Sequence, residues 1–299
     1  MNILKILFYI IKHPLNKNNK LNSILKFLKW QIAYRIIKTK FIFEWVDNTK
    51  FVLEKNETGM SGNLYCGLME YEDMLFIVHL LDENDKFFDI GANVGSYTLL
   101  ASGVKRCKTV CFEPIQSTFQ RLIDNVNLNR INHLVDLKNN GVGNKNEVLS
   151  FSNNLNTTNK VILDTNNYNL TEVDVITLDD NFTPNEKTIV KIDVEGYEFF
   201  ILKGGIKFFS NSNVIAILIE LNGSGKLYGI DDADIHQYIL NFGFKPIRYN
   251  PFTRTPYNID DYKSSSGGNT IYVRNIDFIK ERCLNSKKVC IKTANNLSI

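Results

Sequence analysis

The sequence has few of the residues that stabilise small secreted domains or bind structural zinc. Its 299 residues include five cysteines, and no two of them form a Cys-x-x-Cys pair. An odd number of scattered cysteines argues against a disulfide framework and a zinc site, and it favours a reducing compartment such as the cytosol. The cysteines are Cys66, Cys107, Cys111, Cys283 and Cys290.

Long apolar runs are also absent from the start of the sequence. The apolar stretch at residues 3–11 is interrupted by Lys5, and it is shorter than the roughly 20 residues of a transmembrane helix. It has no basic segment before it and no small-residue cleavage site after it, so it does not match a signal peptide. We therefore expect a cytoplasmic protein.

Acidic residues are absent from residues 1–40, a segment that we call the head and that carries nine Lys and Arg side chains. The rest of the chain has 26 basic and 32 acidic residues, so the net charge of +3 hides a basic head on a mildly acidic body. Residues 21–37 have apolar side chains at helical spacing, with Lys and Arg between them. We expect a basic helical extension at residues 1–50 and the main domain at residues 51–299.

The basic head is typical of a segment that binds an anionic membrane surface peripherally. The same pattern is explained by packing against the body or by a dimer arm. These alternatives stay open at the level of sequence.

The body alternates short apolar runs with helix-like segments. The runs that are typical of buried strands lie at residues 87–90, 109–112, 134–137, 189–192, 214–221 and 270–273. The helix-like segments lie at residues 69–81, 95–102, 117–129, 198–209 and 232–242. This alternation predicts a parallel, doubly wound α/β sheet. Two additional strands are predicted at residues 148–151 and 172–178.

A glycine turn follows the first of these strands. Asp89 lies near the strand end, and Gly91, Asn93 and Gly95 lead to a helix that starts near Ser96. Glycine permits a tight turn and a closely bound ligand, and free amides at a helix start favour a carboxylate. The spacing departs from the Gly-x-Gly-x-x-Gly of dinucleotide-binding folds. An acid there suits the ammonium group of S-adenosylmethionine, which has no phosphate; a purely structural turn is the alternative.

The next two strand ends extend this candidate cofactor site. Glu113 ends the second strand, where a carboxylate can accept both ribose hydroxyl protons. Capping of the following helix is the alternative role for Glu113. The third strand leads to Asn140 and Gly141, whose amides could border an adenine ring.

The fourth strand ends in two acids, Asp193 and Glu195, followed by Gly196. Both acids would lie at the carboxyl edge of the sheet, where doubly wound folds bind ligands. Buried carboxylates need a donor, a metal or a substrate hydroxyl, and a carboxylate beside a hydroxyl can act as a general base. We take Asp193 as the catalytic base and Glu195 as the second candidate. A helix-capping role is the alternative for Glu195.

The fifth strand ends with Glu220, a third catalytic candidate, and Asn222 follows it. Together with Asp193, these side chains offer the oxygen ligands that Mg²⁺ prefers. No ligand-spacing rule supports this set, so a divalent cation stays an open alternative.

These motifs, in their order, resemble the FkbM family of methyltransferases over about residues 70–275. The matching segments are residues 89–95, 112–114, 178–180, 190–198 and 202–205. The resemblance implies a class I, Rossmann-like sheet of seven mostly parallel strands with helices on both faces and a final antiparallel hairpin. It also implies transfer of a methyl group from S-adenosylmethionine to an oxygen. Residues 1–50 lie outside the resemblance.

The resemblance also implies roles for single residues. Glu113 would hold the ribose, and Asp193 and Glu195 would face the transferred methyl group. The residues expected to hold the methionine part are Asp89, Gly91, Asn93 and Gly95, to which we add Ser96.

The acceptor is not determined by the resemblance, because the family methylates sugars and polyketide-type hydroxyls. We expect a sugar hydroxyl in bacterial surface-glycan biosynthesis, with a polyketide- or lipid-type hydroxyl as the alternative. Four aromatic residues between Arg248 and Lys263 suit a sugar ring, although they also fit ordinary surface. These are Tyr249, Phe252, Tyr257 and Tyr262.

Two other classes of function are disfavoured. A nucleic-acid methyltransferase would be expected to carry a basic, aromatic-rich stripe near its motifs, whereas this body is acidic. The Asn/Asp-Pro-Pro-aromatic run of base-modifying enzymes is also missing after the fourth strand. A non-catalytic binding module would not need the intact acidic pair Asp193 and Glu195.

Overall fold

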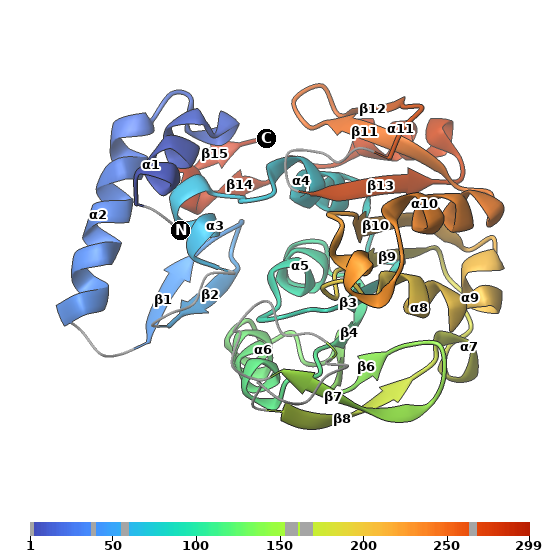
Figure 1. Ribbon diagram of the computed structural model, residues 1–299. Helices are drawn as coiled ribbons and strands as arrows, with labels where there is room; N and C mark the ends of the chain where they lie inside the picture. Colours follow the sequence, from blue (N-terminus) through green and yellow to red (C-terminus); the bar gives the residue numbers. More distant parts are fainter. Residues whose placement is uncertain (1–2, 37–39, 55–59, 153–160, 162–169, 263–267) are drawn as a thin grey trace.

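In the computed structural model, a large twisted sheet lies at the centre of one lobe, and a smaller lobe lies beside it (Figure 1). The structure describes residues 3–36, 40–54, 60–152, 161, 170–262 and 268–299. The larger lobe contains the motifs of the predicted cofactor site, and the smaller lobe contains the head.

The helices are α1 (Ile3–Lys12), α2 (Lys20–Ile36), α3 (Ser61–Cys66), α4 (Tyr71–Leu80), α5 (Ser96–Thr98), α6 (Gln116–Leu128), α7 (Leu178–Asn181), α8 (Glu198–Lys203), α9 (Ile206–Ser210), α10 (Asp232–Asn241) and α11 (Ile276–Asn285). The strands are β1 (Phe41–Glu44), β2 (Lys50–Leu53), β3 (Lys86–Ile90), β4 (Lys108–Phe112), β5 (Val135–Lys138), β6 (Gly141–Val142), β7 (Glu147–Ser152), β8 (Leu170–Ile176), β9 (Thr188–Ile192), β10 (Val214–Glu220), β11 (Lys245–Asn250), β12 (Thr255–Asn258), β13 (Asn269–Val273), β14 (Cys290–Ile291) and β15 (Leu297–Ser298).

The main sheet has eight strands in the order β12-β11-β13-β10-β9-β3-β4-β5. The five strands from β10 to β5 are parallel, and β13, β11 and β12 are antiparallel to their neighbours. Seven of the strands form the doubly wound sheet with a final antiparallel hairpin that the sequence predicts, so the predicted fold class is confirmed. The apolar runs of the sequence located six of the eight strands; β11 and β12 were not among them. β12 contains Pro256, which an edge strand can accommodate.

Successive residues of the central strands enter opposite halves of the core, as the pleat of a strand requires. Phe87 and Leu218 pack with α4, α6 and α11 on one face of the sheet. Phe88 and Ile217 pack with α8, α9 and α10 on the other face. The apolar runs of the sequence therefore correspond to strands that are covered by helices on both sides.

Two of the predicted helices are divided in the structure. The segment at residues 198–209 forms α8 and α9, which are separated at Gly204 and Gly205. A Cβ atom on Gly204 would lie 1.9 Å from the carbonyl oxygen of Gly143, so two backbone segments pack directly against each other there. The segment at residues 95–102 forms the short helix α5, which is followed by a π-helical turn at Leu99–Val104.

The two additional strands predicted between the third and fourth units are confirmed as β7 and β8. They pair antiparallel with each other, and β6 pairs parallel with β8. This small sheet has its own apolar cluster, which includes Ile115, Phe151 and Val175. Figure 1 shows it below the main sheet, next to β4 and α6.

The head packs against the body through one side of α2. Phe27 and Trp30 on that side are buried, and the ring centroid of Phe27 lies 5.2 Å from that of Tyr65 in α3. The Nζ atom of Lys26 donates a hydrogen bond of 2.6 Å to the carbonyl oxygen of Thr293. Packing against the body is therefore observed for this side of α2. No helix among the described residues is long and apolar enough to cross a membrane.

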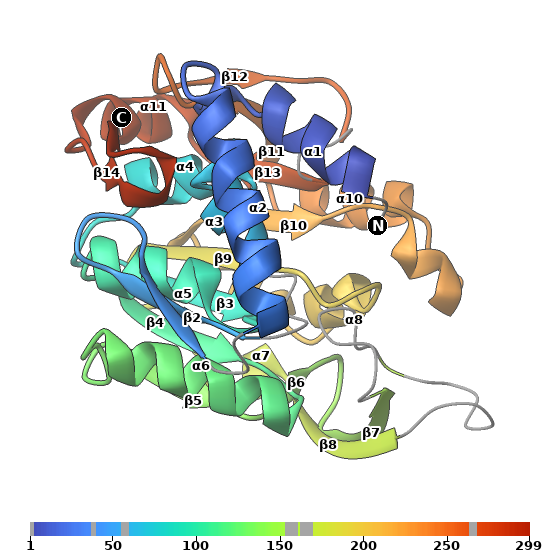
Figure 2. The ribbon, with the colours of Figure 1, turned by 90° about the vertical axis from the view of Figure 1, so that its left-hand side faces the viewer.

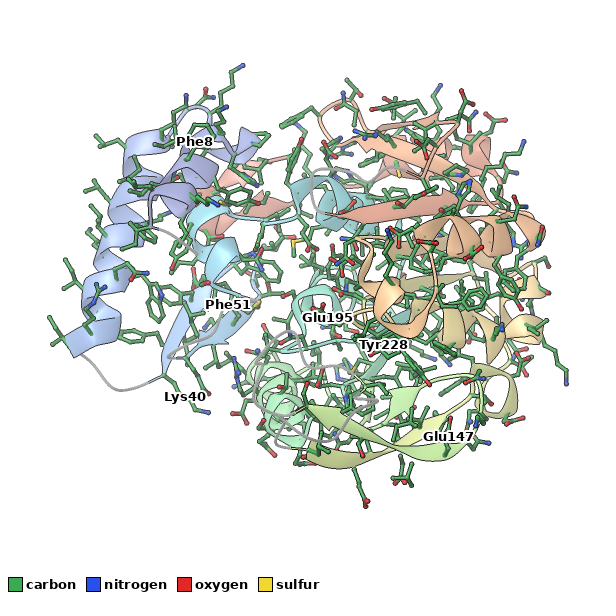
Figure 3. The ribbon with its side chains drawn as sticks, in the orientation of Figure 1. Phe8, Lys40, Phe51, Glu147, Glu195 and Tyr228 are labelled. Carbon is green, nitrogen blue, oxygen red and sulfur yellow. The ribbon has the colours of Figure 1, made fainter. Side chains whose placement is uncertain are left out.

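Residues 290–298 complete the same lobe through β14 and β15, which pair with each other. The amide of Asp47 donates to the carbonyl oxygen of Cys290 at 2.7 Å, and the amide of Lys292 donates to that of Trp45 at 2.6 Å. Figure 3 shows Phe51 inside this lobe and Lys40 at its edge. The predicted division of the chain at residue 50 stays a proposal.

We expect Phe27→Ala to lower the free energy of unfolding by about 3–5 kcal/mol, because it removes a ring that is buried between α2 and α3. Leu28, the next residue, is 45% exposed, and Leu28→Ala should cost less than about 1 kcal/mol. Urea-induced unfolding measures both. Equal losses would contradict the packing of α2 described above.

Candidate functional site

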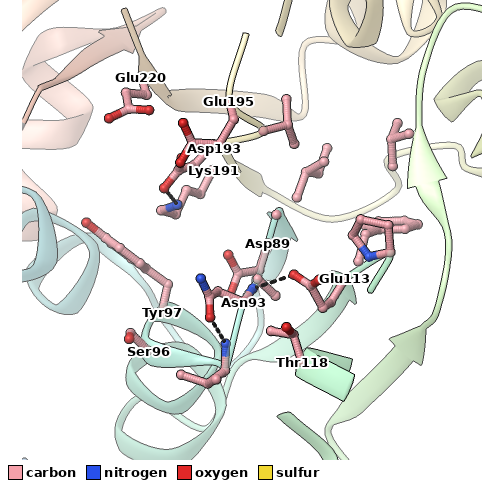
Figure 4. Close-up of a pocket in the computed structure, with 18 of the residues that line it drawn as sticks. Asp89, Asn93, Ser96, Tyr97, Glu113, Thr118, Lys191, Asp193, Glu195 and Glu220 are labelled. Atoms are coloured by element: carbon pink, nitrogen blue, oxygen red, sulfur yellow. Dashed lines mark hydrogen bonds and ion pairs between the residues drawn. The ribbon is translucent and has the colours of Figure 1, made fainter. Parts of the chain in front are cut away.

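A pocket of about 300 Å³ lies where the carboxyl ends of β3 and β9 meet. The order of the parallel strands reverses between these two strands, and doubly wound folds bind ligands at such a point. Figure 4 shows Asp193, Glu195 and Glu220 on one side of the pocket and Asn93 and Ser96 on the other. Of the predicted site residues, those that line the pocket are Asp89, Gly91, Asn93, Ser96, Glu113, Asn140, Gly141, Asp193, Glu195 and Glu220.

The loops after β3 and β9 touch each other at Gly91. This residue has a φ of +82°, and a Cβ atom on it would lie 1.8 Å from the carbonyl oxygen of Asp193. The amide of Asp193 donates to the carbonyl oxygen of Ile90 at 3.0 Å. Glycine is therefore needed at position 91 for the contact between the two loops.

Gly95 does not line the pocket, and the structure gives a different reason for a glycine at this position. Its φ is +94°, and a Cβ atom on it would lie 2.6 Å from Cδ1 of Leu122 in α6. The residue is therefore required for packing against α6. Its predicted role in cofactor binding stays a prediction.

Asp89 offers a buried acceptor to a ligand. The hydroxyl of Thr98 donates to Oδ2 of Asp89 at 2.7 Å, whereas Oδ1 has no hydrogen-bond partner among the described residues. Burial raises the pKa of Asp89. Because buried carboxylate oxygens are normally hydrogen-bonded, Oδ1 is suited to a cationic or hydrogen-donating group of a ligand.

The acids of the pocket surround one buried ammonium group, that of Lys191. Lys191 lies opposite Asp89 in the pairing of β3 with β9, and its Nζ atom is 2.8 Å from Oδ2 of Asp193. Burial lowers the pKa of Lys191, but the carboxylates of Asp193, Asp89 and Glu70 outweigh burial and raise the pKa above its usual value. Lys191 is therefore positively charged. The sequence pattern did not single it out, although a lone lysine in an apolar strand was a signal.

Glu70 and Tyr97 form a further part of the pocket wall that was not predicted. The hydroxyl of Tyr97 donates to Oε2 of Glu70 at 2.6 Å, and Nζ of Lys191 lies 4.9 Å from the centroid of the Tyr97 ring. Burial raises the pKa of Glu70. Glu70 immediately precedes α4 and belongs to no strand end, so no local motif marks it.

Glu198, the first residue of α8, holds the turn that carries the acidic pair. Its Oε1 atom accepts hydrogen bonds from the amides of Val194 and Gly196, each at 3.1 Å. Burial raises the pKa of Glu198 to about 7. Glu195 has a φ of +56° within this turn. The orientation of Asp193 and Glu195 therefore depends on Glu198, which ends the matching segment 190–198 but for which no role was predicted.

Glu113 connects the glycine turn to the start of α6. Its Oε2 atom accepts from the amide of Asn93, and its Oε1 atom accepts from the amide of Ile115, each at 3.0 Å. The hydrogen bond from the amide of Ile115, just before α6, is the kind of contact that the helix-capping alternative predicts. Each carboxylate oxygen has a second lone pair, so Glu113 can still accept a hydrogen bond from a ligand. Burial raises its pKa to about 7.

Asn140 and Gly141 border the pocket between β5 and β6. The side-chain amide of Asn140 donates to the carbonyl oxygen of Asp174 at 3.3 Å. A Cβ atom on Gly141 would lie 3.1 Å from Val175 and 3.3 Å from the Phe151 ring. A side chain at position 141 would therefore crowd Val175 and Phe151.

Glu220, which lies beside Asp193 and Glu195, is suited to exchange a proton. It is half-buried at the end of β10. Burial, followed by the charges of Asp193 and Glu195, raises the pKa of Glu220 to about 8. A carboxyl group with such a pKa gains and loses its proton near neutral pH, which is the property of a general acid or base.

The divalent-cation alternative has no support from a cluster of ligands. The described residues contain no group of three or more His, Cys, Asp or Glu side chains that could hold a metal ion. Of the residues considered for Mg²⁺, Asp193 is paired with Lys191. Oδ1 of Asn222 accepts from the amide of Ser224 at 2.9 Å.

Tyr249, predicted among the aromatic residues of the acceptor site, is buried instead. Its side chain is 3% exposed, and its hydroxyl lies 2.6 Å from Nδ1 of His79. The prediction for Tyr249 is wrong because β11 directs this residue into the core against α4. Phe252 and Tyr257 are exposed, and the ring centroid of Tyr262 lies 5.0 Å from that of His236.

Comparison with known proteins agrees with the resemblance noted in the sequence. The family model described as the methyltransferase FkbM domain matches residues 89–246. No curated protein matches the chain in sequence.

Solved structures of other proteins are similar to this chain at low identity. An rRNA methylase from Streptococcus thermophilus is 12% identical, with a TM-score of 0.37 over 67% of this chain and 91% of that chain. TYW2 of M. jannaschii in complex with AdoMet is 14% identical, with a TM-score of 0.40 over 79% and 85%. A precorrin-6y C5,15-methyltransferase from Geobacter metallireducens is 13% identical, with a TM-score of 0.38 over 69% and 85%.

We expect Gly91→Ala to lower the free energy of unfolding by about 3 kcal/mol or more, because the new Cβ would collide with the Asp193 carbonyl. Gly229 is the control. It also has a positive φ, +76°, but no atom lies within 4 Å of its Cβ position. Gly229→Ala should therefore cost only about 1–2 kcal/mol of backbone strain. Urea unfolding that gave equal losses would show that the contact between the two loops is not tight.

The raised pKa of Glu220 predicts a stability that falls with pH. Folding favours the protonated form, so its contribution is complete below the ordinary value of 4.5 and is lost as the pH rises through about 8. We expect the Tm to fall from about pH 6 to about pH 9, and to fall less in Glu220→Gln, which cannot ionise. Glu186→Gln, at an exposed site, should leave the dependence unchanged. Identical profiles for wild type and Glu220→Gln would contradict the raised pKa.

Proposed function

The chain belongs to the FkbM methyltransferase family and uses S-adenosylmethionine as its methyl donor, and from this we propose that it methylates a hydroxyl oxygen of a sugar during the synthesis of a bacterial surface glycan. The observation that carries the proposal is the group of acids at the carboxyl edge of the sheet. Asp193, Glu195 and Glu220 all line the pocket opposite the glycine turn. A methyl transfer to oxygen needs such acids to position a hydroxyl and take its proton.

The side of the pocket with the glycine turn fits S-adenosylmethionine. The unpaired Oδ1 of Asp89 would bind the ammonium group, and the remaining lone pairs of Glu113 would bind the ribose hydroxyls. Asn140 and Gly141 would border the adenine ring. When bound, S-adenosylmethionine supplies a methyl group on a sulfonium, and the electron pair of the broken C–S bond stays on the sulfur while the acceptor oxygen forms the new C–O bond.

The proton of the acceptor hydroxyl would go to Glu220. Its pKa, raised by burial and by the neighbouring acids to about 8, makes its carboxylate a stronger base than an ordinary glutamate. Asp193 is paired with Lys191 at 2.8 Å, which fixes its position. We therefore assign proton removal to Glu220 and orientation of the hydroxyl to Asp193 and Glu195. This assignment differs from the sequence-based prediction, in which Asp193 was the base.

The charge of the pocket supports an uncharged acceptor. Six Asp and Glu side chains line it, with Lys191 as the one basic side chain among its described lining residues. A phosphodiester or a carboxylate at the reacting position would be repelled by these acids. A sugar has no charge and offers several hydroxyls for them to bind. The same argument weighs against a nucleic acid as the acceptor.

The site of action is part of the same proposal. Bacterial surface glycans are assembled from lipid-linked precursors at the inner face of the cytoplasmic membrane. We therefore propose that the enzyme works in the cytoplasm, in peripheral contact with that face. The basic head is the part of the chain that would make the contact.

The acceptor class is tested by mass spectrometry of glycans extracted from cells with and without the gene. We expect a sugar that carries one additional methylene mass, present only with the gene. The purified enzyme should transfer the labelled methyl group of S-adenosylmethionine to the unmethylated glycan. Label that enters RNA and no glycan would contradict the proposal.

The assignment of Glu220 is tested by kinetics. Glu220→Gln should lower kcat by about 100-fold or more, and the rise of kcat/KM near pH 8 should disappear. Affinity for S-adenosylmethionine, measured by calorimetry, should stay at the wild-type value. Glu186→Gln is the control for the loss of a surface carboxylate. Unchanged turnover in Glu220→Gln would exclude it as the base.

A further inference from the structure

α2 has a second apolar side, opposite the one that packs against the body. Five aliphatic side chains of α2 have exposed fractions between 44% and 73%; they are Leu21, Leu25, Leu28, Ile32 and Ile36. Their spacings of three and four residues place them along one side of the helix. Phe27 and Trp30 project from the other side and are buried. We call this exposed row the outer face of α2.

Two basic residues lie along the outer face. Lys29 and Arg35 are exposed, and each is three residues from Ile32 in the row. α1 adds Phe8, which is 59% exposed and has Nζ of Lys12 4.2 Å from its ring centroid. Figure 3 shows Phe8 at the outside of the head. The head has no acidic residue to neutralise this charge.

Figure 2 shows α2 in front of the rest of the molecule, with no other element over it. A row of exposed aliphatic side chains on a soluble domain commonly marks a surface that binds a partner or a membrane. A helix with an apolar face and flanking Lys and Arg has the composition of one that lies flat in a lipid interface.

We propose that the outer face of α2 is a binding surface for an anionic lipid bilayer. The five aliphatic side chains enter the boundary between headgroups and acyl chains, and Lys29 and Arg35 pair with lipid phosphates. Because the other side of α2 is bound to the body, this contact holds the catalytic domain in one orientation on the membrane. The inference rests on the peripheral membrane contact proposed above and names the surface that makes it, but it requires neither the acceptor class nor the catalytic assignments.

The charge of the outer face favours a bilayer over a second copy of the chain as the partner that covers it. Two α2 helices packed by their outer faces would bring Lys29 and Arg35 of both copies together. Residues 1–40 contain no acid that could pair with them, and like charges at such an interface are destabilising. An anionic bilayer offers a phosphate to each basic side chain.

The proposal is tested by flotation of the full-length protein with lipid vesicles. We expect the protein to float with vesicles of phosphatidylcholine and phosphatidylglycerol, and not with vesicles of phosphatidylcholine alone. Added salt should weaken the binding, because it screens exposed charges. Flotation with both vesicles alike, or with neither, would overturn the proposal.

Two double variants separate the apolar and the electrostatic contributions. Leu28→Gln with Ile32→Gln should weaken vesicle binding about tenfold or more. Lys29→Gln with Arg35→Gln should weaken it roughly tenfold to thirtyfold. Leu284→Gln changes a comparably exposed leucine, 48% exposed, on α11 and should have no effect. Wild-type binding by either double variant would overturn the proposal.

Two measurements complete the test. Circular dichroism and calorimetric affinity for S-adenosylhomocysteine should be unchanged in all variants, because the substituted side chains are exposed and distant from the cofactor residues. Sedimentation should show no dimer at the concentrations used for flotation. A dimer that the Leu28→Gln, Ile32→Gln variant dissociates would overturn the membrane proposal in favour of a second copy.

Discussion

One buried ammonium group allows the acids of the pocket to lie together. Carboxylates gathered at one sheet edge repel one another, and Lys191 lies among them, opposite Asp89 and paired with Asp193. It is held in charged form because those carboxylates outweigh the burial that lowers its pKa. Glu220 lies farther along the same wall and has a pKa of about 8, raised by burial and by its acidic neighbours. The pocket thus contains one acid that is ion-paired, Asp193, and one that can exchange a proton, Glu220. Many acid–base sites divide these two roles between neighbouring carboxyl groups in this way.

Most of the sheet could be predicted because its strands and helices have clear local patterns. Short apolar runs such as Ile189–Ile192 are typical of buried strands, and helical spacing marks the segments between them. β11 and β12 were not located from the sequence, because each contains a proline, Pro246 and Pro256, which interrupts a strand pattern. The separation of α8 from α9 depends on contact between Gly204 and Gly143, which are far apart in the sequence.

The candidate site could be predicted as far as it lies at strand ends, where parallel strands meet at one edge. Lys191 could not be included, because its importance depends on the register that places it opposite Asp89. Glu70 enters the pocket from the segment before α4, outside every motif. Tyr249 was assigned to the wrong environment because its strand, β11, was not predicted, so nothing in the sequence placed its side chain in the core.

The carbonyl oxygen of Trp45 and the amide of Asp47 are hydrogen-bonded to residues 290–292. The side chain of Asp47 and the amide of Cys290 are joined across 243 positions of the chain. During synthesis these early residues leave the ribosome long before their partners exist, and closing so long a loop is slow. Until then, part of the apolar interior of the smaller lobe is open to chaperones and to premature association. The smaller lobe is therefore completed only after the strands of the main sheet have been synthesised.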